Sequence, residues 1–166
     1  VHARHRDTIR PTVIGHGANT DFSQTSRFHQ EFDWEGTFDP TGWACIPDVL
    51  EFVGQLLPSG WPEVRQRNHA LALEARNLLL QGLGTEPVCP DSMVGSMASI
   101  RLPAALHARL KERGVSLFGE LIDRWKIEIP TIGWKEPARE MVRISCHLYN
   151  ARADYEKLLQ ALNELR

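Results

Sequence analysis

The sequence predicts an α+β fold, in which a small antiparallel sheet of three or four strands is covered by helices on one face. Two observations support this prediction. Apolar residues recur at helical spacing in the middle of the chain and at its end, and short strand-like segments lie between these helices. The predicted elements follow in the order loop, helix, helix, strand, helix, strand, strand, helix. The 166 residues are enough to bury most of the apolar surface without disulfides or a metal.

The first forty residues are predicted to form a loop-rich segment, and residues 41–166 the small α+β domain. Two glycines flank His16 and permit a tight loop beside a ligand or another chain. Aromatic and charged residues then alternate over residues 27–37 without a clear helical or strand period. Long loops of this kind are usually functional or pack against another part of the protein.

Two helices are predicted next. The first begins near Thr41 and stops before Pro58, where a Pro-Ser-Gly turn follows. The second has Pro62 in its first turn and runs to about Gln81, where two glycines end it. The buried faces are expected to carry Ile46, Val49, Leu50 and Val53 in the first helix, and Val64, Leu71, Ala75 and Leu78 in the second.

Three strands are predicted in the second half of the chain, over residues 96–102, 124–129 and 141–145. The middle one is expected because its apolar residues alternate with charged ones, as in a half-buried strand.

Two further helices are predicted around these strands. Pro103 opens a short helix that ends at Gly114, and Asn150 is expected to cap the closing amphipathic helix. The apolar side of the closing helix holds Tyr155, Leu158, Leu159, Leu162 and Leu165.

The composition argues against several classes of protein. The chain carries 19 basic and 21 acidic side chains, giving a net charge of −2, which disfavours a nucleic-acid partner. It shows no apolar run long enough to span a bilayer and no signal peptide, so we expect no membrane partner and a cytoplasmic protein. Three widely spaced cysteines and one close histidine pair, His2 and His5, predict neither a disulfide framework nor a metal site.

Arg143 is the most informative single residue. Its neighbours Val142 and Ile144 should point to one face of a strand, so Arg143 should point to the other. A guanidinium cannot lose its charge and therefore needs an anionic partner. Two interpretations stay open: a salt bridge to an acidic residue of the same domain, or a bidentate clamp on a ligand carboxylate.

Other chemical signals are weaker. Gly36 and Thr37 together offer a backbone N–H and a hydroxyl that can hold a phosphate oxygen, although most such pairs are simple turns. The sequence has no nucleophile elbow, Walker-type glycine loop or His-Glu-x-x-His motif. Cys146 and His147 are adjacent on a predicted strand and therefore face opposite ways, which makes them a poor thiolate–imidazole pair.

Four segments carry motifs in a fixed order. Residues 142–150 read Val-Arg-Ile-Ser-Cys-His-Leu-Tyr-Asn, residues 32–40 read Phe-Asp-Trp-Glu-Gly-Thr-Phe-Asp-Pro, residues 11–17 read Pro-Thr-Val-Ile-Gly-His-Gly, and Ile46 precedes Pro47. These segments resemble the Arg-x-Ser-x-x-x-Tyr-Asn, Phe-x-Trp-x-Gly-Thr-x-Asp, Pro-x-Ile-Ser-His-Gly and Ile-Pro motifs of class V aminotransferase-like, pyridoxal-phosphate enzymes. The isopenicillin N epimerase-like group is the most similar branch, and the spacing fits across the whole chain.

The resemblance implies roles for residues at matching positions. Thr37, with Gly36, would bind the phosphate of pyridoxal 5'-phosphate in the active site of the partner subunit, so the protein would be a homodimer and its N-terminal segment would reach across to that site. Arg143 would hold the α-carboxylate of a small-molecule amino-acid substrate. His16 would lie near the cofactor.

The departures from the family pattern also matter. The family's Schiff-base lysine follows a histidine, which is true of none of the four lysines here. The resemblance therefore implies that the catalytic lysine lies upstream, in a cofactor-binding domain that this chain needs as a partner. Residues 128–135 contain no cysteine, which disfavours the mechanism of the cysteine desulfurases.

We therefore expect the C-terminal portion of a pyridoxal-phosphate enzyme that acts on an amino acid or amino-acid conjugate. Its chemistry would be racemisation or epimerisation, β-elimination or transamination. The alternative is a non-catalytic dimerisation and substrate-recognition domain.

Overall fold

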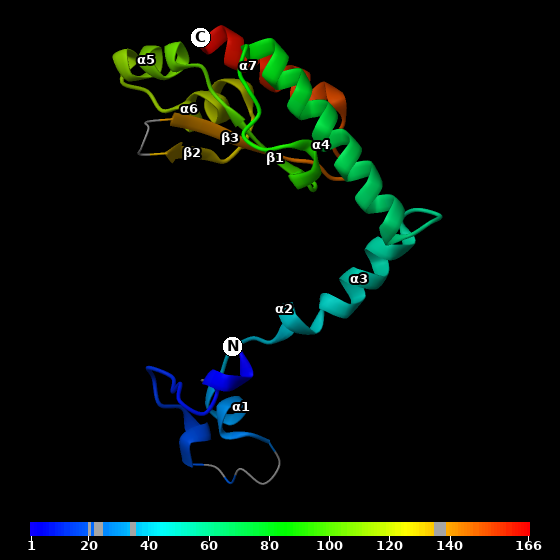
Figure 1. Cartoon of the computed structure of the whole chain (residues 1–166), viewed down its shortest axis with the longest axis vertical. Helices are drawn as coiled ribbons and strands as arrows, with labels where there is room; N and C mark the ends of the chain where they lie inside the picture. The colour runs from blue at the N-terminus through cyan, green and yellow to red at the C-terminus, as the bar shows by residue number, and fades with distance from the viewer. Residues whose placement is uncertain (20, 22–24, 34–35, 135–138) are drawn as a thin grey trace. The chain divides into compact units, whose positions relative to one another are not determined.

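The computed structural model spans the chain and describes all residues except 20, 22–24, 34–35 and 135–138. The chain divides into two compact units, residues 1–50 and residues 51–166, which can be followed by colour in Figure 1. Within the described residues, no helix combines the length and the apolar character that a membrane crossing requires.

Residues 51–166 contain a three-stranded antiparallel sheet, which confirms the predicted fold class. Strand β3 (Arg139–Ser145) lies in the centre, with β1 (Met97–Arg101) on one side and β2 (Thr131–Trp134) on the other. Buried and accessible residues alternate along β1 and β3, so one face of the sheet belongs to the core and the other stays accessible.

Helices cover the buried face of the sheet. Helix α4 (Trp61–Leu83) packs against α7 (Arg152–Leu165) and β1, and Figure 1 shows both helices beside the sheet. Helix α5 (Ala104–Arg113) contacts α7 and β3. Pro62 stands in the first turn of α4, and Gly84, in the left-handed region at φ 67°, ends it. The large apolar side chains that are almost fully buried are Leu79, Leu83, Ile100, Leu106, Leu121, Ile144, Leu162 and Leu165.

The prediction of a strand over residues 124–129 is wrong. Helix α6 (Leu117–Glu120) continues into a π-helical turn, Leu121–Trp125, after which Lys126 adopts φ 56°. This left-handed conformation interrupts an extended strand. The alternating apolar residues still contribute to packing, since Ile129 is buried in the core. Their alternation therefore predicted correctly which side chains are buried, but not that the backbone pairs with another strand.

Residues 1–50 include short helices within the segment predicted to be loop-rich. The helical segments that begin in this unit are η1 (Ala3–His5), η2 (His16–Asn19), α1 (Arg27–Phe32), α2 (Thr41–Ala44) and α3 (Ile46–Gln55). Helix α1 has no recognisable apolar period and is instead started by Ser26, whose hydroxyl accepts a hydrogen bond from the N–H of His29. Helices α2 and α3 together take the place of the single helix predicted from Thr41. The buried face predicted for it is wrong, because Ile46, Val49 and Leu50 are exposed. The remaining short element, η3 (Asp91–Met93), lies in the second unit.

A buried carboxylate organises the first unit. Glu31 is 2% exposed and is the only buried residue among those described in 1–50. Its carboxylate pairs with Arg10 at 2.6 Å and with Arg27 at 2.9 Å. Arg27 also donates to the carbonyl oxygens of Arg6 and Asp7, at 3.0 and 2.8 Å. Two arginines thus compensate the buried charge and tie α1 to the segment that precedes it.

Candidate functional site

Arg143 stands in the centre of the sheet, on its accessible face. Strand β3 places it directly opposite Ser99 of β1, while Val142 and Ile144 on either side of it are buried. Its backbone N–H donates to the carbonyl oxygen of Pro130 at 3.1 Å. In the part of the chain that the structure describes, no acidic side chain forms an ion pair with Arg143. Of the two interpretations of this arginine, the geometry favours an anionic ligand.

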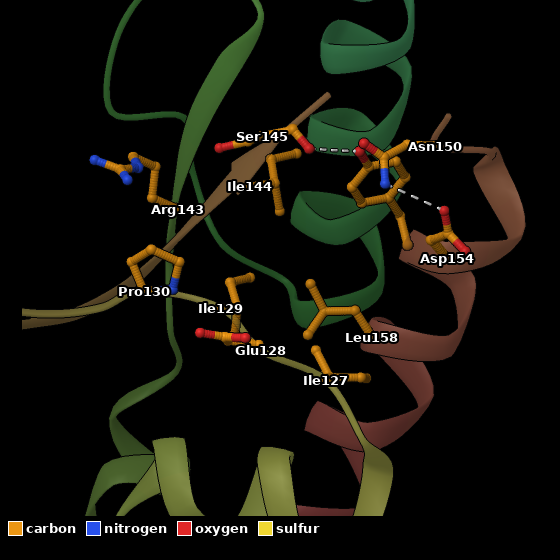
Figure 2. Close-up of a pocket in the computed structure, with 11 residues that line it drawn as sticks. Ile127, Glu128, Ile129, Pro130, Arg143, Ile144, Ser145, Asn150, Asp154 and Leu158 are labelled. Carbon is orange, nitrogen blue, oxygen red and sulfur yellow. Dashed lines mark hydrogen bonds between the residues drawn. The ribbon is translucent and has the colours of Figure 1, made fainter. Parts of the chain in front are cut away.

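A pocket of about 190 Å³ lies beside Arg143. Figure 2 shows Arg143 extending from β3 in a different direction from Ile144, with Leu158 on the Ile144 side. The pocket lining combines apolar side chains with the polar residues Glu128, Ser145, Asn150 and Asp154. Ile144 and Leu158 of this lining are almost fully buried, so the guanidinium of Arg143 is the part of the lining that suits a ligand carboxylate.

The turn that follows β3 is fixed by Asn150. Its side-chain oxygen accepts from the N–H of His147 at 3.1 Å, and its own N–H donates to the carbonyl of His147 at 2.9 Å. The prediction that Asn150 caps the closing helix is wrong, because Ala151 occupies the N-cap position of α7. The carboxylate of Asp154, in the first turn, accepts from the N–H of Ala151 at 2.9 Å. The ring of Tyr149 is 82% exposed and stacks on that of His147 with 4.8 Å between centroids.

A buried pair behind the strand anchors α7 to β3. The hydroxyl of Tyr155 lies 2.9 Å from the carbonyl oxygen of Ser145, to which it donates, and 2.9 Å from Sγ of Cys146. Both side chains are buried. Burial raises the pKa of the Cys146 thiol, although the hydrogen bond with Tyr155 opposes this increase. The pKa of Tyr155 is also raised, mainly by burial and to a smaller extent by the contact with Cys146. The pair is therefore neutral and structural. Sequence reasoning placed Tyr155 only on an apolar helix face, because its partner is nine residues away and on another element.

The stability of residues 51–166 is expected to decrease as the pH rises past the ordinary pKa of a thiol, 9.0, and of a tyrosine, 10.0. The folded chain keeps both protons at a pH where the unfolded chain releases them, so alkali favours unfolding. Urea-unfolding midpoints measured from neutral pH upward test this. The double variant Cys146→Ala/Tyr155→Phe should show a weaker alkaline decrease, and an unchanged decrease would contradict the assignment.

The other predicted site residues lie in the first unit. Gly36 has open space around it, since a Cβ added there would meet no atom within 4 Å. Thr37 is exposed, and both residues precede α2. His16 begins η2. The first unit therefore carries Gly36, Thr37 and His16, and the second carries Arg143.

The chain is similar to two kinds of curated enzyme. It is 33% identical over 141 residues to a probable chloroplastic L-cysteine desulfhydrase of Arabidopsis thaliana, with 81% of this chain and 30% of that protein covered. It is 32% identical over 169 residues to the isopenicillin N epimerase of Amycolatopsis lactamdurans, with 95% of this chain and 39% of that protein covered. The isopenicillin N epimerase of Streptomyces clavuligerus is 30% identical over 82% of this chain and 32% of its own length.

The chain thus spans between 30% and 39% of the length of these curated relatives. No protein-family model matches it.

Proposed function

Because the chain is homologous to part of the isopenicillin N epimerases and L-cysteine desulfhydrases, class V aminotransferase-like pyridoxal-phosphate enzymes, we propose that it supplies the substrate-carboxylate contact of such an enzyme. The observation that supports this most is Arg143, an exposed cation on a central strand that lacks an acidic partner among the described residues. The names of the relatives favour racemisation or epimerisation, or β-elimination, on an amino acid or amino-acid conjugate.

The residues present fit part of the cofactor. Thr37 is exposed, and the space around Gly36 leaves the backbone open to a phosphate oxygen. These two residues would hold the phosphate of pyridoxal 5'-phosphate, with His16 nearby. When bound, the cofactor supplies the electron sink for breaking a bond to the α-carbon of the substrate. None of the four lysines of the chain follows a histidine, so we propose that the lysine that carries the cofactor comes from a cofactor-binding domain elsewhere.

Arg143 would position the substrate. Its planar guanidinium can take both oxygens of an α-carboxylate in two parallel hydrogen bonds, which fixes the orientation of the α-carbon. The sheet supports this function, because the backbone of Arg143 is held by pairing with β1 and by the hydrogen bond to Pro130.

Replacing Arg143 by Ala, in an enzyme that combines this chain with its cofactor-binding domain, is expected to raise KM and lower turnover. The loss in kcat/KM should correspond to about 2–4 kcal/mol of transition-state binding. Arg143→Lys keeps the charge without the planar fork and should recover only part of this loss. Arg109, an exposed arginine of α5, provides the matched control, Arg109→Ala. Unchanged kcat/KM in Arg143→Ala would contradict the proposal.

A second function has one observation in its favour. Several large apolar side chains of the first unit are exposed: Trp43 by 72%, Ile46 by 45% and Val49 by 55%. Such a surface suits a dimerisation and substrate-recognition domain without catalysis of its own. The mass and visible spectrum of the protein purified from its source separate the two proposals. An enzyme should contain the added mass of a cofactor-binding domain and the yellow absorption of bound cofactor, which a recognition domain without catalysis lacks.

A further inference from the structure

The accessible face of the sheet carries a second arginine. In β1, Ala98 and Ile100 are buried, whereas Arg101 alternates with them and lies on the same face as Arg143. The helices that cover the sheet pack on the opposite face, where the buried residues are. The described residues of this accessible face are Met97, Ser99 and Arg101 of β1, Met141, Arg143 and Ser145 of β3, and Ile132 of β2.

The register of the sheet brings the two arginines close together. Arg143 is paired with Ser99, and Arg101, two residues further along β1, is paired with Met141. Arg101 and Arg143 are therefore diagonal neighbours, which lie about 7–8 Å apart in an antiparallel pair and within mutual reach of long side chains. The sequence alone did not show this relation, because it depends on which residues of two distant strands face each other.

Neither arginine has an anionic partner among the described residues. The Nε of Arg101 is shielded from solvent and has no hydrogen-bond acceptor there. Several other arginines of the same unit are paired: Arg76 with Asp91, Arg113 with Glu120, and Arg152 with both Glu74 and Glu156. Two neighbouring unpaired guanidinium groups repel each other, and a shielded donor without an acceptor is costly. A ligand with two anionic groups would remove both costs.

We propose that Arg101 is a specificity-determining residue that binds a second carboxylate, on the side chain of the amino-acid substrate. The inference rests on the proposed function, in which Arg143 holds the α-carboxylate. It names the substrate class as an amino acid or amino-acid conjugate with an anionic group on its side chain. Met141, two residues before Arg143 in β3 and paired with Arg101, gives the aliphatic part of such a substrate an apolar surface.

The test is an NMR titration of the 166-residue chain with glutarate, a dicarboxylate, and with butyrate, a monocarboxylate. The wild-type chain should bind glutarate about tenfold more tightly than butyrate, as expected for one additional charge-assisted hydrogen-bonding contact. Arg101→Gln should remove this preference and leave the affinity for butyrate unchanged. Arg101→Lys, which retains a cation, should keep part of the preference. Arg109→Gln should behave as wild type.

The outcomes separate this inference from the proposed function. A glutarate preference that survives Arg101→Gln, or a wild-type chain that binds both probes equally or binds neither, would overturn the assignment of Arg101. Butyrate affinity that is unaffected by Arg143→Gln would instead count against the proposed function. The backbone amide spectrum of each variant shows whether it is folded. If Arg101→Gln does not fold, Arg101→Lys provides the test.

Discussion

Replacing Leu162 by Ala is expected to lower the free energy of unfolding of residues 51–166 by about 2–5 kcal/mol. Leu162 is fully buried on α7, the helix that packs against α4. Its truncation removes apolar contacts and leaves a cavity between elements whose positions are fixed by the sheet. A domain of this size is stabilised by only about 5–15 kcal/mol, so the loss is a large fraction of the total.

Urea unfolding followed by circular dichroism measures this effect. Lys157, an exposed residue of the same helix, provides the control, and Lys157→Ala should change the free energy of unfolding by less than about 0.5 kcal/mol. Similar midpoints for the two variants would show that the packing of α7 on α4 does not stabilise this unit. The comparison is within one helix, so a difference in helix propensity between the two sites contributes little.

The elements that the sequence predicted well are those whose local pattern and tertiary environment agree. Helices α4 and α7 have clear ends, and Val64, Ala75 and Leu162 of their predicted faces are buried, whereas Leu71 and Leu78 are only partly buried. Strand β3 was predicted because Val142 and Ile144 alternate with Arg143. The wrong prediction at residues 124–129 has a related cause. Alternation of apolar and charged residues predicts which side chains are buried, but the left-handed conformation of Lys126 and the absence of strand pairing at these described residues depend on the rest of the fold.

The candidate site was predictable to a smaller extent. The exposure of Arg143 follows from its neighbours, and the openness of the backbone at Gly36 follows from its residue type. Arg101 was missed because strand register decides its neighbour, and Glu31 was missed because burial of a carboxylate cannot be read from a charged sequence. The spacing of Arg27 and Glu31, four residues apart, was the available signal for that ion pair.

Replacing Gly17 by Ala is expected to disrupt the order of the first unit. A Cβ at Gly17 would lie 1.8 Å from the carbonyl oxygen of Gln30 and 2.4 Å from its carbonyl carbon. Both atoms belong to the backbone of α1, so no side-chain rotation relieves the clash and η2 must separate from α1. Overpacking typically costs about 1–3 kcal/mol, which corresponds to roughly a 5-fold to 150-fold loss of amide protection in a unit that opens locally.

Amide hydrogen exchange of α1 and η2, compared between Gly17→Ala and Gly36→Ala, tests this prediction. A Cβ at Gly36 meets no atom within 4 Å, so this variant should retain wild-type protection. The urea midpoint of residues 51–166 should be the same in both variants, because that unit has its own core. Retained protection of α1 in Gly17→Ala would mean that η2 and α1 do not pack as the structure shows.

The expected result also separates packing from ligand binding within the Gly15-His16-Gly17 motif. Glu31 is the only buried residue described in 1–50, so this unit has little apolar packing with which to absorb a displaced backbone. The close approach to Gln30 is therefore a sufficient reason for a glycine at position 17. It follows that the proposed place of His16 near the cofactor must be tested on His16 itself, since loss of cofactor in Gly17→Ala would follow from disorder alone.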